Sequence, residues 1–165
     1  MDIAELNDTQ LPNTGNNIKE GKMKSSPNLV YHLKVFLSTL IIMAAIDFLW
    51  LGLVANKLYS SELGSLIGVA GGNMASRWPA AAIVYILLPL GLVLFILPRL
   101  GSRERAWSLL WGAMFGLVVY GVYDLTNLAL LPQWSLKVTI IDILWGMFLY
   151  AIVSFIISYI EKLFR

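Results

Sequence analysis

The sequence predicts an all-α integral membrane protein, a bundle of four transmembrane helices with both chain termini in the cytoplasm. Of its 165 residues, 58% are hydrophobic and only 13% are charged, which is too apolar a composition for a water-soluble domain of this size. The hydrophobic residues gather into four long stretches, and most Lys and Arg residues lie on one side of those stretches. We therefore expect a multi-pass protein whose main surroundings are the lipid bilayer.

The chain begins with a polar segment, residues 1–28, in which acidic and basic residues alternate with Asn, Thr, Gly and Pro without a sustained period. This composition is typical of a disordered tail. The segment starts with acidic residues and lacks a short apolar run before a cleavage site, so we do not expect a secretory signal. We assign residues 29–165 to one four-helix transmembrane domain.

Each of the four apolar stretches is long enough to cross a hydrocarbon core of about 30 Å at about 1.5 Å per helical residue. Their residues are continuously apolar, whereas transmembrane strands alternate in polarity. Pro89 removes a backbone donor and predicts a kink in the second span. Between the first two spans, residues 56–78 predict a short interfacial helix and a glycine-rich turn. The expected spans are about 35–55, 80–97, 106–131 and 138–160.

The distribution of positive charges predicts the orientation of the spans. Nine Lys and Arg residues lie in the N-terminal segment, the 98–105 loop and the C-terminus, and only Lys57, Arg77 and Lys137 lie on the opposite side. Cytoplasmic segments of membrane proteins carry an excess of Lys and Arg. We therefore expect both termini in the cytoplasm, with the bacterial inner membrane as the location.

The composition also excludes several classes of function. A net charge of +2 from 12 basic and 10 acidic residues is too small for a nucleic-acid partner. The chain has no Cys, and His32 is its single histidine, so cysteine-ligated metal centres and Ser-His-Asp catalysis are excluded. We assign no cofactor and no metal ligands.

Three acidic residues lie inside the expected spans, at Asp47, Asp124 and Asp142. An Asp near the centre of a transmembrane helix costs about 2.5–3.5 kcal/mol on the insertion scale. The three residues lie four to eight positions from the expected outer ends of their spans, which corresponds to roughly 6–12 Å of depth. We therefore expect three helices to bring their carboxyl groups together at nearly one level.

Each acidic residue has polar or aromatic neighbours three or four positions away, on its own helix face. An indole N–H can donate a hydrogen bond to a carboxylate in a dry site. Gly112 and Gly116 continue the polar line of the third span and predict a close helix contact. We expect this contact within the chain, with a dimer interface as the alternative. The candidate polar cluster for a proton, a cation or a substrate consists of Asp47, Trp50, Tyr120, Tyr123, Asp124, Asn127, Asp142 and Trp145.

Three motifs carry a resemblance to a known family: IDFLWLG at 46–52, YDLTNLA at 123–129 and IDILWG at 141–146. With four spans of this length, the chain resembles the domain-of-unknown-function 2177 family of small bacterial integral membrane proteins over about residues 33–160. The resemblance implies a four-helix membrane architecture and no particular reaction. The positions that match the motifs are Asp47, Trp50, Tyr123, Asp124, Asn127, Asp142 and Trp145.

Three hypotheses about function follow from the acidic residues. The first is a carrier that binds or conducts a proton or a small cation, and we expect a homodimer in that case because four helices are few for a transport path. The second is a membrane-embedded enzyme that acts on a lipid-like substrate, with one Asp as general acid and another as base. The third is a non-catalytic assembly or accessory subunit whose acidic residues only hold the helices together. The sequence does not decide whether the protein is an enzyme.

Overall fold

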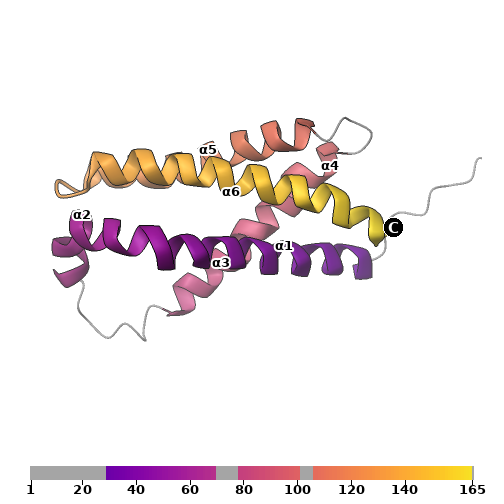
Figure 1. The fold of residues 1–165 in the computed structure, drawn as a ribbon, viewed down its shortest axis with the longest axis horizontal. Coiled ribbons are helices and arrows are strands. Elements are labelled where there is room, and N and C mark those ends of the chain that lie inside the picture. Colours follow the sequence, from indigo (N-terminus) through magenta and orange to yellow (C-terminus); the bar gives the residue numbers. More distant parts are fainter. Residues whose placement is uncertain (1–28, 70–77, 101–105, 165) are drawn as a thin grey trace, which may run out of the picture.

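The computed structural model describes residues 29–69, 78–100 and 106–164, and every regular element in these ranges is helical. Four helices are long and apolar enough to cross a membrane, which confirms the predicted all-α fold with four spans. The tail predicted at residues 1–28 lies outside the described residues. Figure 1 shows α1, α5 and α6 running along the long axis of the molecule and α3 crossing them, with the C-terminus and the start of α1 at the same end.

The first span is longer than the sequence predicted. α1 (Leu29–Trp50), the π-helix η1 (Leu51–Ala55) and α2 (Asn56–Val69) follow one another directly, and the helix runs from Leu29 to Gly64 without a break. A helix follows residue 55, as the sequence predicted, but it continues the first span directly and is not separated from it. The membrane boundary at residue 55 stays a prediction, and the expected glycine-rich turn falls mostly outside the described residues. The drop in hydropathy at Asn56 and Lys57 marks a change in polarity, and these residues keep the helical conformation.

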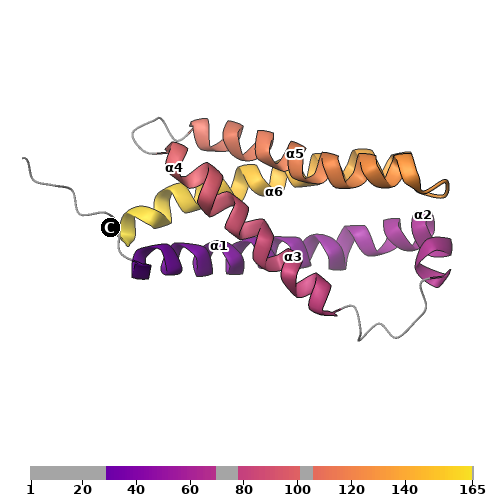
Figure 2. The same ribbon diagram turned by 180° about the vertical axis from the view of Figure 1, so that it is seen from behind.

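The second span consists of α3 (Trp78–Gly91), the π-helix η3 (Leu92–Ile96) and α4 (Leu97–Leu100). Pro89 lies inside α3, and η3 begins three residues after it, with helical backbone angles at Gly91. Figure 2 shows this span crossing the other helices obliquely. It contacts α1 near its beginning and α5 and α6 near its end.

The last two spans, α5 (Ala106–Leu130) and α6 (Leu136–Leu163), form a closely packed antiparallel hairpin. A Cβ atom added to Gly112 would overlap the carbonyl oxygen of Tyr150, and one added to Gly116 would overlap the carbonyl oxygen of Gly146. Glycine therefore lets the two backbones approach directly at this seam. The contact predicted for Gly112 and Gly116 lies within the chain.

α6 carries more buried residues than any other described helix, and it contacts elements of all three other spans. Its side chains at Val138, Leu149, Val153 and Ile157 are fully buried. At the end that holds the C-terminus, the Tyr31 hydroxyl donates a hydrogen bond of 2.7 Å to Glu161, which ties α1 to α6.

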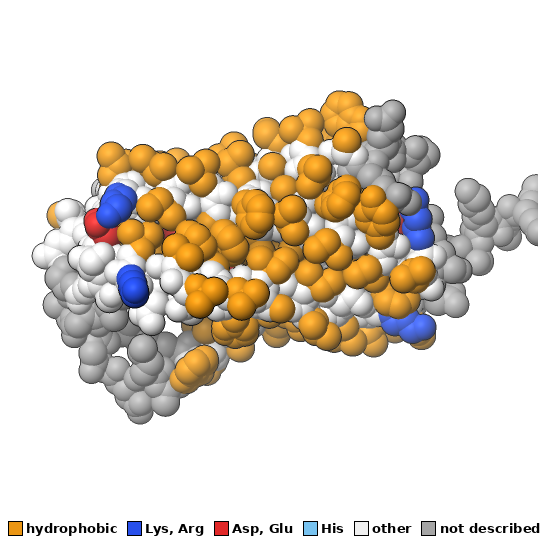
Figure 3. All heavy atoms as spheres, in the orientation of Figure 1, with side chains coloured by type: hydrophobic (Ala, Val, Ile, Leu, Met, Phe, Trp, Pro, Cys, Tyr) orange, Lys and Arg blue, Asp and Glu red, His pale blue; other side chains and the backbone are white. Residues whose placement is uncertain are grey.

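The outer surface of the molecule is strongly apolar between two charged ends (Figure 3). Large hydrophobic side chains are exposed on every span, for example Leu53 at 75% and Val122 at 65%. A soluble monomer rarely exposes a continuous apolar surface of this kind. The surface agrees with a lipid environment, and the direction in which the spans cross the membrane stays a prediction.

Candidate functional site

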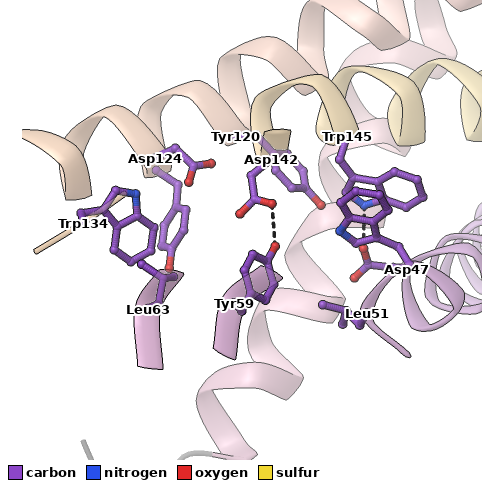
Figure 4. A pocket seen from close by; sticks show the side chains of 11 residues that line it. Asp47, Leu51, Tyr59, Leu63, Tyr120, Asp124, Trp134, Asp142 and Trp145 are labelled. Carbon is purple, nitrogen blue, oxygen red and sulfur yellow. Dashed lines mark hydrogen bonds between the residues drawn. The ribbon is translucent and has the colours of Figure 1, made fainter. Parts of the chain in front are cut away.

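A cavity of about 380 Å³ lies between the first span and the α5–α6 hairpin, next to the turn at residues 131–135. We call it the acidic cavity, and Figure 4 shows its wall from close by. Side chains from α1, η1, α2, α5, α6 and the turn contribute to it. The lining residues are Asp47, Trp50, Leu51, Tyr59, Leu63, Tyr120, Tyr123, Asp124, Trp134, Asp142 and Trp145.

The acidic cavity includes seven of the eight residues that the sequence grouped together. The exception is Asn127, whose side-chain nitrogen is buried without a hydrogen-bond partner among the described residues but which does not line the cavity. Four lining residues were not assigned to a site from the sequence. They are Leu51, Tyr59, Leu63 and Trp134.

Asp47 is held by two hydrogen bonds from two other spans. The Trp145 indole nitrogen donates to one carboxylate oxygen at 3.0 Å, and the Tyr85 hydroxyl donates to the other at 2.7 Å. The ring of Tyr85 also stacks on Phe48, with the ring centroids 5.5 Å apart. Asp47 therefore joins the first span to α3 and α6, and each of its oxygens has a donor.

Asp142 has one donor from the first span. The Tyr59 hydroxyl donates a hydrogen bond of 2.6 Å to one oxygen of Asp142, across the cavity between α2 and α6 (Figure 4). Asp142 is 7% exposed. A hydrogen bond to a charged acceptor contributes about 1.5–3 kcal/mol, so this bond helps to hold α2 against α6.

Asp124 differs from the other two acidic residues. Its side chain is fully buried, at 0% exposure, and neither carboxylate oxygen has a hydrogen-bond partner among the described residues. It lines the acidic cavity, and Figure 4 shows its carboxylate on the same side as that of Asp142. Burying a polar group without a hydrogen-bond partner costs free energy of folding. Asp124 is therefore the carboxyl group of this site that still lacks a hydrogen-bond donor.

Two tryptophans form a stacked pair in the wall of the acidic cavity. The rings of Trp50 and Trp145 have centroids 4.4 Å apart and are inclined by 9°. The indole nitrogen of Trp145 donates to Asp47, whereas that of Trp50 is buried without a partner among the described residues. Trp50 therefore leaves one hydrogen-bond donor unused at the cavity.

The π-helix η1 explains why the sequence did not assign Tyr59 to the site. At about 100° per residue, twelve α-helical steps would leave Tyr59 about 120° away from Asp47 around the helix axis. η1 lies between these two residues, and a π-helix uses i to i+5 hydrogen bonds, which add about one residue to a turn. The extra residue turns Tyr59 back by about 100°, onto the face of Asp47.

The three carboxyl groups lie within about one helical turn of one another along the helix axes. Asp124 lies six residues before the end of α5 at Leu130, and Asp142 lies six residues after the start of α6 at Leu136. Asp47 is bonded to Trp145, which is three residues beyond Asp142, or about 4.5 Å along the helix. Two carboxyl groups therefore share a level and the third lies about one turn deeper.

Contacts between α2 and the start of α6 tie the helices together beside the acidic cavity. Ser135 caps α6 by accepting a hydrogen bond from the Val138 backbone N–H at 3.4 Å, and its hydroxyl donates to Glu62 at 2.7 Å. Lys137 forms a salt bridge of 3.0 Å with the same carboxylate. An acidic group near a helix N-terminus is also favoured by the helix dipole.

The acidic residues of the described chain do not converge on a metal ion. Among residues 29–69, 78–100 and 106–164, no group of three His, Cys, Asp or Glu side chains could hold a metal. Figure 4 shows the three carboxylates distributed along the cavity, with Asp142 between Asp124 and Asp47. The arrangement offers separate carboxyl groups in an aromatic wall.

Comparison with known families agrees with the resemblance found in the motifs. A family model described as "Predicted membrane protein (DUF2177)" matches residues 32–159. The chain belongs to this family. The DUF2177 match contains all three buried Asp residues and every residue that lines the acidic cavity. Searches of curated proteins and of solved structures found no match.

Proposed function

We propose that the protein is a membrane carrier that binds and exchanges a proton, or a cation in place of the proton, at Asp124. The observation that carries this proposal is the buried carboxyl group of Asp124, which has no hydrogen-bond partner among the described residues. An ionised carboxylate in this setting needs a counter-charge, and ionisable groups inside membrane spans are typical of proton and ion pathways. Asp124 can meet this need by holding a proton or a positively charged ligand.

The other titratable groups of the acidic cavity support a row of proton-accepting positions. Asp142 lies between Asp124 and Asp47 in Figure 4, and Tyr59 donates to Asp142 from the opposite wall. Tyr120 and Tyr123 complete the titratable residues that line the cavity. Asp47, with a donor on each oxygen, forms the inner end of the row.

The proposal includes an orientation and an assembly. With both termini in the cytoplasm of a bacterial inner membrane, the acidic cavity faces the outer leaflet, because Trp134 of the turn between α5 and α6 lines it. That turn lies at the end opposite the described C-terminal residues (Figure 1). A carrier in this orientation would load from the outer side. Four spans leave little room for a second opening in one chain, so we propose a homodimer as the transporting unit.

The test is proton influx into liposomes that contain the purified protein and a pH-sensitive dye. A potassium gradient with valinomycin provides the driving force, and the wild type is expected to acidify the interior faster than protein-free liposomes do. In Asp124→Asn, the rate is expected to fall to that of protein-free liposomes, because an amide cannot release a proton. Glu62→Gln is the matched control, since Glu62 is an acidic residue that does not line the cavity and should keep the wild-type rate.

Two results would contradict the carrier proposal. One is a folded wild-type protein that adds nothing to the influx of protein-free liposomes. The other is an Asp124→Asn variant whose influx equals that of the wild type. Equal losses in Asp124→Asn and Glu62→Gln would mean that influx depends on the fold and not on the acidic cavity.

One observation favours a membrane-embedded enzyme with a lipid-like substrate as a second candidate. Tyr123 lines the acidic cavity and is also 60% exposed on the apolar surface of α5, so a lipid-like molecule could reach the cavity from the bilayer. Asp124 and Asp142 have different hydrogen-bonding environments, as a general acid and a general base require. Lipid extracts of cells with and without the protein would differ under this hypothesis and agree under the carrier hypothesis.

A further inference from the structure

The acidic cavity has a chemical composition that is unusual for a site that binds only protons. Of the eleven described residues that line it, six are aromatic, three are acidic and two are leucine, and none of them is Lys, Arg or His. Aromatic faces carry negative electrostatic potential and attract organic cations, most strongly when water is excluded. Carboxylates and aromatic rings in one wall therefore select for positive charge on an apolar molecule.

The size of the acidic cavity also points beyond a proton. Its volume of about 380 Å³ compares with about 30 Å³ for one water molecule and lies within the range of about 300–1,000 Å³ for small-molecule sites. No three carboxylates of the described chain stand close enough together for a metal ion. The space fits a molecule of several heavy atoms better than a bare ion.

The unused hydrogen-bonding groups define what such a molecule must present. Asp124 offers two acceptor oxygens and Trp50 offers one indole donor, all buried and without partners among the described residues. Asp47 has no oxygen left without a donor, since Tyr85 and Trp145 each bond one. A matching ligand therefore brings a cationic N–H donor to Asp124 and an acceptor to Trp50.

We propose that the acidic cavity binds a small organic ammonium ion, with the ammonium group at Asp124 and the apolar body against the aromatic wall. This inference rests on the proposed function, because the ammonium group takes the place of the exchangeable proton at Asp124. The stacked rings of Trp50 and Trp145 provide one aromatic face, and the tyrosines of α2 and α5 provide others. Tyr123, which is exposed on the lipid side, marks the entrance for an amphipathic cation.

Two probes of equal size test the inference: 2-phenylethylammonium, which is charged, and 2-phenylethanol, which is neutral. Their binding to the purified full-length protein in lipid nanodiscs is measured by titration calorimetry and by the fluorescence of the tryptophans in the cavity wall. The charged probe is expected to bind about tenfold more tightly than the alcohol, because its ammonium group gains the desolvated aromatic faces and the carboxylate of Asp124. A tenfold difference corresponds to about 1.4 kcal/mol.

Variants assign the binding to the cavity. Asp124→Asn is expected to lower the affinity for 2-phenylethylammonium by about tenfold, while the affinity for 2-phenylethanol stays unchanged. Trp50→Phe is expected to reduce the affinity for both probes, because it removes part of the stacked aromatic face. Trp107→Phe is the matched control, because Trp107 lies in the first turn of α5, away from the cavity, and it should change neither affinity.

The inference is overturned if both probes bind the wild type equally, because the site would then recognise only apolar shape. Absence of saturable binding to the folded wild type also overturns it. If Asp124→Asn does not fold, the comparison of the two probes on the wild type still tests the inference. Proton influx without ammonium binding would contradict this inference and leave the carrier proposal in place. Ammonium binding without proton influx would contradict the carrier proposal and leave the ammonium site in place.

Discussion

The two sides of α6 hold their neighbours by different means. On one side, α5 packs backbone against backbone through Gly112 and Gly116, with no room for a Cβ atom. On the other side, the first span is held by side-chain hydrogen bonds such as Tyr59 to Asp142 and Trp145 to Asp47, with the acidic cavity between them. A close-packed backbone contact has one arrangement, whereas hydrogen-bonded side chains can exchange partners with a ligand. We infer that the hairpin is the rigid wall and the first span the adaptable one.

The largest expected effect comes from breaking the rigid wall. Gly116→Ala places a methyl group on the backbone of Gly146, so the helices must separate, and we expect a loss of about 3 kcal/mol in the free energy of unfolding. Unfolding in mixed micelles, followed by circular dichroism, measures this loss.

Gly121→Ala is the control on the same helix, because a Cβ atom there would meet nothing within 4 Å. We expect it to be neutral or slightly stabilising, since Ala favours helix over Gly by about 1 kcal/mol. Equal destabilisation by the two variants would show that the seam does not depend on glycine.

The next prediction concerns the register of the adaptable wall. Inserting one alanine after Leu53 adds a helical residue between Asp47 and Tyr59, which turns Tyr59 by about 100° away from Asp142. We expect proton influx in the liposome assay to fall to the protein-free rate in this variant. Deleting Leu53 is the control, because it removes the extra residue of η1 and eleven α-helical steps keep Tyr59 within about 20° of the face of Asp47. The deletion should keep wild-type influx, and normal influx in the insertion variant would contradict the role of this register.

The smallest expected effect comes from removing one donor of Asp47. Tyr85→Phe keeps the ring that stacks on Phe48 and removes only the hydroxyl that bonds Asp47. Trp145 still donates to the other oxygen, so we expect a loss of about 1 kcal/mol in unfolding free energy. A loss as large as that of Gly116→Ala would mean that the hydrogen-bonded side is as rigid as the glycine seam.

The sequence predicted the parts of the fold that depend on hydropathy. Span length and polarity identified four helices, and the insertion cost of a charged residue singled out Asp47, Asp124 and Asp142. The sequence did not predict that the first helix continues directly to Gly64, because polarity changes at Asn56 while the helical conformation does not.

The site itself was only partly predictable, since a uniform helical period cannot anticipate a π-helix. Tyr59 was missed for that reason, and Trp134 was missed because its position near the end of a span is also typical of an interfacial anchor. Asn127 belongs to the predicted polar face of α5 but does not line the cavity. That face spans about 120°, and the cavity borders only part of it.

The hydrogen bonds of Asp47 have a consequence for biosynthesis. Its donors Tyr85 and Trp145 follow it by 38 and 98 residues in the chain. At a translation rate of about 5–20 residues per second, the indole is made about 5–20 s after the carboxyl group. During that interval one oxygen of Asp47 lacks its indole donor, so the final packing of the first helix depends on the last helix to be synthesised.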